Sequence, residues 1–533
     1  MADHPQHRPV TLASHGVVSA PHYLAAQAGL DLLKTGGNAI DAAIAASAVL
    51  QVVHPQLCGL GGDLFALVYS ARDRKLHGLN ASGAASHSAS IERYHSLGYT
   101  CMPAFGIHTV TVPGCPDGWQ ALSDRFGNRG LDSCLAPAIS YARDGFPVGP
   151  GLHAALQRMN TMSHTHPAFR QNFMPGGNIP AAGSMGYAPD LARTLERIGE
   201  RGAADFYRGE LARQIADFFA REGGLLDNED LANHASQWVQ PLSVNFAGMQ
   251  IHELPPNTQG ITALQMLGML DGLQLGPEPD DPLTVHLTVE AKKLAFADRS
   301  AYLTDLNHMR VSPASLIEPA YLARRAALIS SRAAESATAG SIAGDTIYLC
   351  ATDEAGNVVS LIQSNYRGFG SGVVVEGTGI SLQNRGAYFS LDPEAANALA
   401  PSKRTLHTLI PSIAMRDDKP LIVFRAMGGD GQAQTHAQVY TALLKYGLNM
   451  QAAIEMPRWL HGVDQPGDPE ALYMENRFPD STLADLTERG HTVRTVNAWH
   501  SMMGHAQGIL IDNDTGIFHG GADPRGEGAA VGW

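Results

Sequence analysis

Residues 344–364 constrain the fold more than any other part of the chain. The stretches 346–351 and 358–363 are rich in β-branched and apolar side chains, which predicts two strands. Asp353–Asn357 lies between them and consists of turn residues, with Gly356 able to adopt a positive φ. The segment therefore predicts a β-hairpin.

The register of this hairpin would bring two hydroxyl groups together at its open end. If the turn is centred near Ala355, the numbers of opposed residues sum to about 710, so Thr346 faces Ser364. Directly opposed residues have Cβ atoms about 4.5–5.5 Å apart. Threonine and serine are common on strands, so the pairing alone does not define a site.

The residues that precede the hairpin allow a second interpretation of Thr346, as a nucleophile at a new N-terminus. The stretch Ala334–Ala343 is small, polar and without periodicity, which is typical of an exposed linker. Cleavage between Asp345 and Thr346 would place a hydroxyl nucleophile and a free α-amine on one residue. The unperturbed pKa of an α-amine is about 7.7–8.0, which suits a general base at neutral pH.

Composition narrows the class of protein and its partners. The 533 residues are 44% hydrophobic and 17% charged, which predicts a well-packed globular chain. The net charge is −14 without a Lys/Arg-rich run, so we expect neither nucleic acid nor a membrane as partner. We found no secretory signal and no apolar run of about 18 residues. Five cysteines without CxxC spacing favour reduced thiols and a cytoplasmic protein.

Glycine-rich turns and histidines were considered as binding sites. Leu57–Asp63 lacks the Lys-Ser/Thr of a phosphate-binding loop, so we interpret it as a close-packed turn before a strand. The turn 426–431 precedes a predicted helix, where backbone N–H groups either bind an anion or serve only packing. His164 and His166 lack a third ligand at a recognised spacing. We therefore predict neither a metal nor a cofactor.

Hydrophobic periodicity predicts a mixed α and β chain. The expected helices are 17–34, 38–53, 118–125, 133–144, 152–159, 189–200, 211–222, 260–271, 285–302, 321–334 and 433–446. The expected strands outside the hairpin are 64–70, 107–113, 249–254, 373–375, 382–384, 405–415, 421–425, 504–512 and 516–519.

Several short motifs, in order along nearly the whole chain, together resemble the γ-glutamyltranspeptidase family of N-terminal-nucleophile hydrolases. The motifs are Gly36–Ala43, His54-Pro55-Gln56, Leu60-Gly61-Gly62, Ala295–Arg299, Asp353–Asn357, Phe369–Gly372, Lys403-Arg404, Gly428-Gly429 and Asp523-Pro524-Arg525. Each motif is weak, whereas the ordered set is specific.

The resemblance implies an α+β fold, a four-layer αββα sandwich. It also implies a proenzyme that cleaves itself into a large subunit, 1–345, and a small subunit, 346–533, which form one fold as a heterodimer and dimerise further in some cases. The nucleophile of the family falls on Thr346 and its second hydroxyl on Ser364. The backbone oxyanion hole falls on Gly428 and Gly429.

Departures from the family pattern bear on the substrate. The arginine that binds the α-carboxylate is missing near Ser82, and the groups that hold the α-amine correspond to Tyr388 and Arg385. The serine pair of the family corresponds to His407 and Thr408. Arg385 offers a bidentate fork for a carboxylate, although a structural ion pair is the alternative role.

The predicted substrate-binding set also includes Asn365 and Tyr366, which follow Ser364. The pattern suits a small amide whose acyl group carries a carboxylate and no α-amine, as in the oxamate amidohydrolase or glutaryl-acylase branches. The alternatives are a γ-glutamyltransferase or glutathione hydrolase, and an uncleaved binding protein with the same fold.

Overall fold

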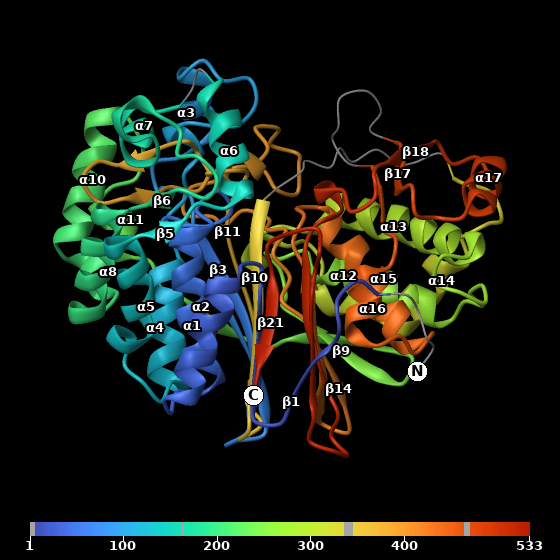
Figure 1. Cartoon of the computed structure of the whole chain (residues 1–533). Helices are drawn as coiled ribbons and strands as arrows, with labels where there is room; N and C mark the ends of the chain where they lie inside the picture. Colours follow the sequence, from blue (N-terminus) through green and yellow to red (C-terminus); the bar gives the residue numbers. More distant parts are fainter. Residues whose placement is uncertain (1–5, 163–164, 335–344, 463–469) are drawn as a thin grey trace.

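Two β-sheets lie face to face in this computed structural model, and helices cover the outer face of each sheet (Figure 1). The structure describes residues 6–162, 165–334, 345–462 and 470–533. The four layers are those of the predicted αββα sandwich, so the predicted fold class is confirmed.

The first sheet, called the β10 sheet here, contains strands from both sides of the predicted cleavage position. Its seven strands pair antiparallel in the order β21-β2-β10-β11-β3-β4-β7. They are β21 (Ala529–Gly532), β2 (Gly16–Ala20), β10 (Asp345–Asp353), β11 (Val358–Tyr366), β3 (Asp63–Ser70), β4 (Lys75–Ala81) and β7 (Gln237–Val239).

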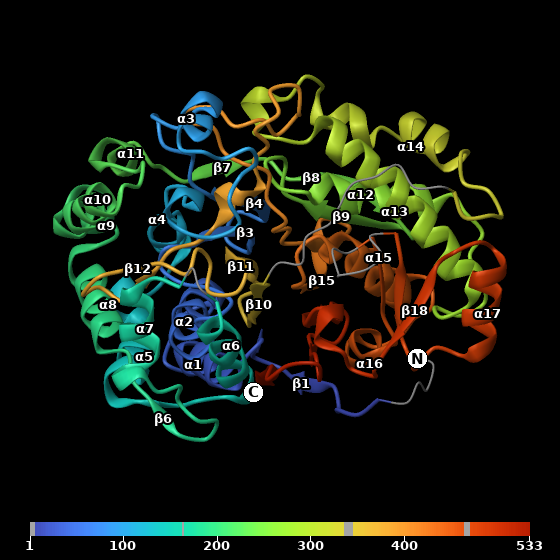
Figure 2. The same cartoon turned by 90° about the horizontal axis from the view of Figure 1, so that it is seen from above.

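The second sheet, called the β15 sheet, is also antiparallel and has the order β1-β20-β19-β15-β14-β9-β8. Figure 2 shows its row of strands beside that of the β10 sheet, seen from above. Its strands are β1 (Thr11–Ala13), β20 (Phe518–Ala522), β19 (Ala506–Ile511), β15 (Lys419–Ala426), β14 (Ile413–Arg416), β9 (Met249–Glu253) and β8 (Leu242–Phe246).

The helices fall into two groups, one beside each sheet (Figure 1). Beside the β10 sheet are α1 (Tyr23–Lys34), α2 (Ala39–Val53), α3 (Ile91–Ser96), α4 (Cys115–Phe126), α5 (Leu131–Asp144), α6 (Pro150–Asn160), α7 (Pro167–Phe173), α8 (Pro189–Arg201), α9 (Ala204–Arg208), α10 (Glu210–Glu222) and α11 (Asn228–Ala232). Beside the β15 sheet are α12 (Gly260–Asp271), α13 (Pro282–Tyr302), α14 (Pro319–Ala326), α15 (Gly431–Leu444), α16 (Met450–Glu455) and α17 (Asp480–Glu488).

Short elements complete the described chain. The small strands are β5 (Phe146–Pro147) with β6 (Met185–Gly186), β12 (Val374–Val375) with β13 (Ile380–Ser381), and β16 (Trp459–His461), β17 (Leu472–Glu475) and β18 (Val493–Val496). The 3-10 turns are η1 (Ile107–Thr109), η2 (Pro175–Gly177), η3 (Leu306–His308), η4 (Pro313–Ile317), η5 (Arg385–Tyr388) and η6 (Ser501–Met503).

Helix α2 is buried over its whole length, as its nearly uniform apolar sequence predicts. Asn38 begins the helix with a capping box, in which its side chain accepts from the backbone of Asp41 while the Asp41 carboxylate accepts from the Asn38 N–H. The glycine turn that follows α2 is close-packed, because a Cβ at Gly61 would lie 2.4 Å from the carbonyl oxygen of Ser381.

The apolar side chains of the β10 sheet pack in two layers, one on each face, as the alternation of side chains along a strand requires. Tyr348, Cys350 and Ile362 face the β15 sheet and pack between the two sheets. Ile347 and Leu349 face the helices beside the β10 sheet. All five cysteines are free, and Cys350 packs in the core as expected.

Five sequence predictions of secondary structure are wrong in full or in part, including the strand predicted over 382–384, where β13 has already ended at Ser381 and only Leu382 forms an isolated bridge, with Gly61. Residues 17–20 form β2, because the β-branched Val17 and Val18 pair with β10, and the helix begins only at Tyr23. Segment 107–113 is a 3-10 turn followed by chain outside any strand, and the helix predicted over 321–334 ends at Ala326. Segment 405–415 is strand only from Ile413, after Pro411.

No helix in the described ranges is long and apolar enough to cross a membrane.

Candidate active site

Three polar side chains lie side by side at one end of the β10 sheet, on the face turned toward the β15 sheet. The Oγ1 atom of Thr346 on β10 is 3.1 Å from the Oγ atom of Ser364 on β11. Asp63 on β3 is the direct ladder partner of Ser364. All three are buried. The predicted hairpin register is confirmed from Ile347 to Thr352; the ladder shifts between Asp345 and Ile347, and the two hydroxyl groups still meet.

The backbone after Ser364 holds the serine hydroxyl in place. The Tyr366 N–H donates a 2.7 Å hydrogen bond to Ser364 Oγ. Tyr366 has φ of +79°, a conformation that non-glycine residues rarely adopt. This bend directs the peptide of Tyr366 back toward the hydroxyl pair.

Asp63 is a buried carboxylate with one unpaired oxygen. Its Oδ1 accepts from the Gly83 N–H, whereas Oδ2 has no hydrogen-bond partner in the described structure and lies 3.5 Å from His407 Nε2. Burial raises the pKa of Asp63 to about 7, against the opposing effect of the Arg385 charge. Asp63 therefore changes charge near neutral pH.

Arg385 at the start of η5 is a buried cation that is only partly paired. Its Nη1 donates to Thr408 Oγ1 at 3.3 Å, and its guanidinium lies 4.3 Å from the ring centroid of Tyr366. The Nε and Nη2 atoms have no partner among the described residues. Two adjacent unpaired N–H groups match the two oxygens of a carboxylate.

His407 and Thr408 lie beside Arg385, so the structure brings these three predicted residues together. The His407 ring packs edge-on against Phe65 at 5.0 Å. Burial and the neighbouring charges of Arg385 and Arg404 hold the pKa of His407 well below its usual range. His407 is thus a neutral donor next to a cation.

Gly428 and Gly429 form a turn between the end of β15 and the start of α15. Their φ values are +135° and +55°, and a Cβ at Gly428 would lie 3.4 Å from Gly504 Cα. Neither N–H donates to a backbone carbonyl of a described residue. Both donors therefore remain for an anionic oxygen.

A buried ion pair and several hydrogen bonds hold this glycine turn in place. Arg299 on α13 pairs with Asp430, whose carboxylate also accepts a 2.7 Å bond from the Tyr388 hydroxyl. Gln259 accepts from Arg299 at 2.8 Å and donates to the carbonyl oxygens of Gly429 and Thr408 at 3.3 and 3.1 Å. Gln259 thus joins the glycine turn to the Thr408 segment.

One predicted substrate-binding residue, Asn365, points away from the hydroxyl pair, and two others, Ser82 and Tyr388, are hydrogen-bonded to protein side chains. Asn365 lies on the opposite face of β11 from Ser364, packed against Gly59 and Gly62, where a Cβ would lie 2.8 and 2.6 Å from its amide. Ser82 Oγ donates to Asn80 and accepts from Asn257. Tyr388 binds Asp430 and lies beside Tyr366, at 5.6 Å between ring centroids.

Sequence reasoning missed Asp63, Arg299 and Gln259 as site residues, and it also missed the buried cation Arg425 on β15. Arg299 ends one of the motifs that carry the family resemblance and Asp63 directly follows another, but nothing local shows what these two residues contact. Arg425 on β15 is buried, and none of its guanidinium nitrogens has a hydrogen-bond partner in the described chain. Burial lowers its pKa to about 9, while Glu253 opposes that shift.

Clusters of potential metal ligands occur away from these residues, and some of their ring nitrogens already have a hydrogen-bond partner. In the cluster of His22, His54 and Glu527, His22 Nδ1 accepts the Leu24 N–H, which leaves the proton on Nε2, the atom facing Glu527. In a second cluster, His286 bonds to His491 at 2.8 Å. His166, considered in the sequence, pairs with Glu222, and His164 lies outside the described residues.

The whole chain resembles known amide-cleaving proteins. A cephalosporin acylase from Bacillus halodurans superposes with a TM-score of 0.93 at 42% identity, covering 100% of this chain and 98% of that one. A glutathione hydrolase-like proenzyme of Bacillus subtilis (strain 168) is 39% identical over 520 residues, 97% of this chain and 98% of the relative. An oxamate amidohydrolase proenzyme of Klebsiella pneumoniae is 39% identical over 529 residues, 98% and 99% of the two chains.

The resemblance inferred from short motifs is therefore confirmed over nearly the full length. The family described as gamma-glutamyltranspeptidase matches residues 25–533. This chain belongs to the γ-glutamyltranspeptidase family and is an amide-bond hydrolase of the N-terminal-nucleophile class.

Proposed function

We propose that the chain cleaves itself ahead of Thr346 and then hydrolyses a small amide whose acyl group carries a carboxylate. The observation that carries this proposal is the pair of unpaired guanidinium N–H groups of Arg385, beside the donors His407 and Thr408. A buried cation without a protein anion favours an anionic ligand, because an unpaired charge in the interior is costly.

In this proposal, cleavage of the Asp345–Thr346 peptide bond supplies the general base, which the intact chain lacks. While that bond is intact, the Thr346 nitrogen is an amide nitrogen and has no basic lone pair. After hydrolysis it is a free α-amine next to its own hydroxyl, and Ser364 is within hydrogen-bond distance of that hydroxyl.

In the proposed reaction, Thr346 Oγ1 attacks the amide carbonyl carbon while the α-amine accepts the hydroxyl proton. The negative charge on the former carbonyl oxygen is stabilised by the Gly428 and Gly429 N–H groups. The C–N bond then breaks as the protonated α-amine gives its proton to the leaving nitrogen. Water attacks the resulting ester by the same proton path and releases the carboxylic acid and Thr346.

The acyl group is held by its carboxylate on Arg385 in this proposal. A substrate with an α-amine would need an acidic partner, and Tyr388 and Arg385 occupy the positions that the family resemblance assigns to that role. The relatives include names for both substrate classes, γ-glutamyl compounds and oxamate-like amides, because one is described as glutathione hydrolase-like and another as an oxamate amidohydrolase.

A substrate panel on purified protein tests the proposal. Intact-mass spectrometry should find fragments beginning at residues 1 and 346, and oxamate or a glutaryl amide should be hydrolysed faster than a γ-glutamyl anilide. Faster release from the γ-glutamyl anilide would contradict the proposed substrate class. A single uncleaved chain without amidase activity would favour the binding-protein alternative.

A further inference from the structure

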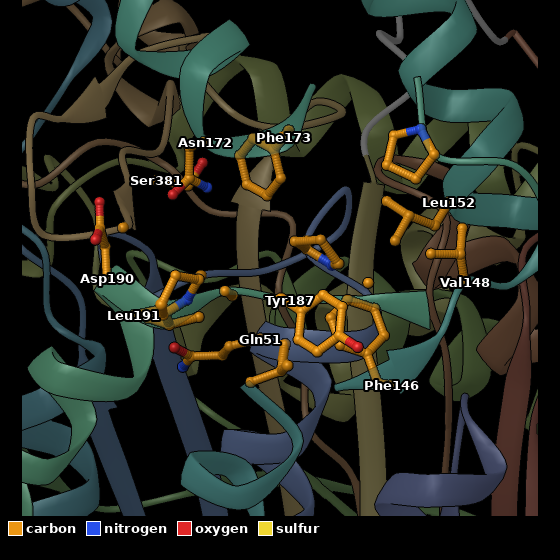
Figure 3. A pocket seen from close by; sticks show the side chains of 18 of the residues that line it. Gln51, Phe146, Val148, Leu152, Asn172, Phe173, Tyr187, Asp190, Leu191 and Ser381 are labelled. Carbon is orange, nitrogen blue, oxygen red and sulfur yellow. The ribbon is translucent and has the colours of Figure 1, made fainter. Parts of the chain in front are cut away.

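A cavity of about 390 Å³ lies beside the β10 sheet, away from the hydroxyl pair. Its walls come from α2, the glycine turn after α2, α6, and the β5–β6 and α7–α8 segments. Figure 3 shows Tyr187, Phe146 and Gln51 on one side and Phe173 and Asn172 on the other. The volume is within the range of about 300–1,000 Å³ that is usual for small-molecule sites.

Apolar and aromatic side chains form most of this cavity. Phe146, Leu152 and Leu156 are buried in its wall. Met185 and Tyr187 line its rim, although 53% and 57% of their surface is exposed. Large apolar side chains that gather at the mouth of a cavity are typical of a site for an apolar molecule.

Two buried polar side chains in the wall have unused hydrogen-bonding atoms. Gln51 and Ser381 are 2% and 3% exposed, and neither Gln51 Oε1 nor Ser381 Oγ has a partner in the described structure. The Gln51 amide is oriented by its Nε2 group, which donates to Cys115 Sγ at 3.4 Å. An acceptor left unpaired in the interior is unfavourable, and a ligand donor would relieve this.

The scarcity of charged side chains in the lining of the cavity favours a neutral ligand. Asp190 is the one ionised side chain among its described lining residues, and it already pairs with Arg193. A charged ligand would therefore enter an apolar space without a free counter-ion.

We propose that this cavity binds a neutral aromatic molecule through one N–H or O–H group donated to Gln51 Oε1. None of Thr346, Ser364, Arg385, Gly428 and Gly429 lines the cavity, so this site is separate from the amidase site and does not depend on the proposed function.

A pair of probes of similar shape tests the proposal on the wild-type protein. N-phenyl-1-naphthylamine has one N–H donor and becomes fluorescent in apolar sites, whereas 1-phenylnaphthalene lacks the donor. Equilibrium titration should give saturable binding of the amine with a stoichiometry of one. The hydrocarbon, measured by competition, should bind about 3–10-fold more weakly, as expected for one lost hydrogen bond.

Two variants locate the probe. Ala188→Trp adds a large side chain at the rim of the cavity and should abolish saturable binding, while Ala320→Trp, exposed on α14, should leave it unchanged. Gln51→Leu should weaken binding of the amine about 3–10-fold and leave the hydrocarbon unaffected. Thermal melting checks that each variant is folded, and Thr346→Ala should bind the amine like wild type.

Equal affinity for the two probes would overturn the role of Gln51. Unchanged binding in a folded Ala188→Trp protein, or no saturable binding to wild type, would overturn the site itself. Loss of probe binding in Thr346→Ala would show that the probe occupies the amidase site instead.

Discussion

Asp63 lies directly opposite Ser364 in the ladder that joins β3 to β11. Its free Oδ2 atom is 3.5 Å from the His407 ring, which lies beside Arg385. The aspartate therefore connects the hydroxyl pair with the cation that we propose for acyl recognition. The ladder fixes the Asp63 and Ser364 end of this connection, because both residues lie on paired strands.

Replacing the nucleophile should stop both reactions of the chain. Thr346→Ala removes the attacking hydroxyl, so we expect neither self-cleavage nor amide hydrolysis, whereas Thr346→Ser should retain both. Intact mass and an amidase assay measure the two effects. Thr352→Ala, on the same buried strand, is the matched control. Cleavage ahead of residue 346 in Thr346→Ala would contradict the assignment.

Removing the second hydroxyl should lower kcat more than it changes KM. Ser364→Ala leaves Thr346 without its 3.1 Å partner and the Tyr366 N–H without its acceptor. A lost buried hydrogen bond of about 1–3 kcal/mol predicts a roughly 10–100-fold decrease in kcat. Ser360→Ala removes a serine from the same strand and face, and it should retain near wild-type kcat. A wild-type rate in Ser364→Ala would exclude the serine from the mechanism.

Arg385 should discriminate between charged and neutral acyl groups. Arg385→Gln removes the guanidinium fork, so KM for a carboxylate-bearing amide should rise about 10–100-fold. KM for the methyl ester of the same amide should change little. Arg367→Gln is the matched control, because Arg367 also packs against the ring of Tyr366, with 5.4 Å between its guanidinium carbon and the ring centroid. An equal effect of Arg385→Gln on both substrates would indicate a structural role.

The raised pKa of Asp63 predicts a pH dependence with a definite sign. Between about pH 4 and pH 7 the unfolded chain has an ionised Asp63 while the folded chain keeps the proton, so the contribution of this group to stability falls as the pH rises through that window. Asp63→Asn should remove this decrease. Apparent melting temperatures of both proteins from pH 5 to pH 8 measure the difference.

The same titration should affect substrate binding. Above pH 7 the ionised Asp63 competes with the substrate carboxylate for the charge of Arg385, so KM should rise with pH in wild type and less in Asp63→Asn. A constant difference in melting temperature together with parallel KM profiles would contradict the assigned pKa.

Breaking the ion pair behind the glycine turn should be costly. Arg299→Met leaves Asp430 buried without its cation, and losing one partner of a buried pair typically destabilises by about 3–5 kcal/mol. Lys445→Met breaks the exposed pair with Asp271 and should cost about 1 kcal/mol or less. Denaturant unfolding compares the two variants. Equal costs would mean that Arg299 does not stabilise the turn.

Local patterns predicted the parts of the site that depend on neighbouring residues. The β-branched stretches and the Gly356 turn predict the hairpin and its register, and they therefore place Thr346 beside Ser364. The period of two along a strand also explains the position of Asn365, since a residue that follows Ser364 must point to the opposite face. Applying that period would have excluded it from the predicted set.

Contacts between distant segments could not be predicted in this way. Arg299 and Asp430 are 131 positions apart, and Gln259 and Gly429 are 170 apart. Which residues meet in these pairs depends on the packing of α13 and α12 against the β15 sheet. The helix predicted from Val17 failed for a related reason, because pairing with β10 outweighs the local helical pattern.

The position of β10 within its sheet has a consequence for the cleaved protein. Strands β10 and β11, which follow the proposed cut, lie between β2 and β3, which precede it, so both polypeptides contribute strands to one continuous sheet. The two polypeptides could separate only if the central hydrogen bonds of that sheet were broken. We expect the fragments to co-elute in native gel filtration and to separate only in denaturant, because the strand pairing formed before cleavage continues to hold the two polypeptides together.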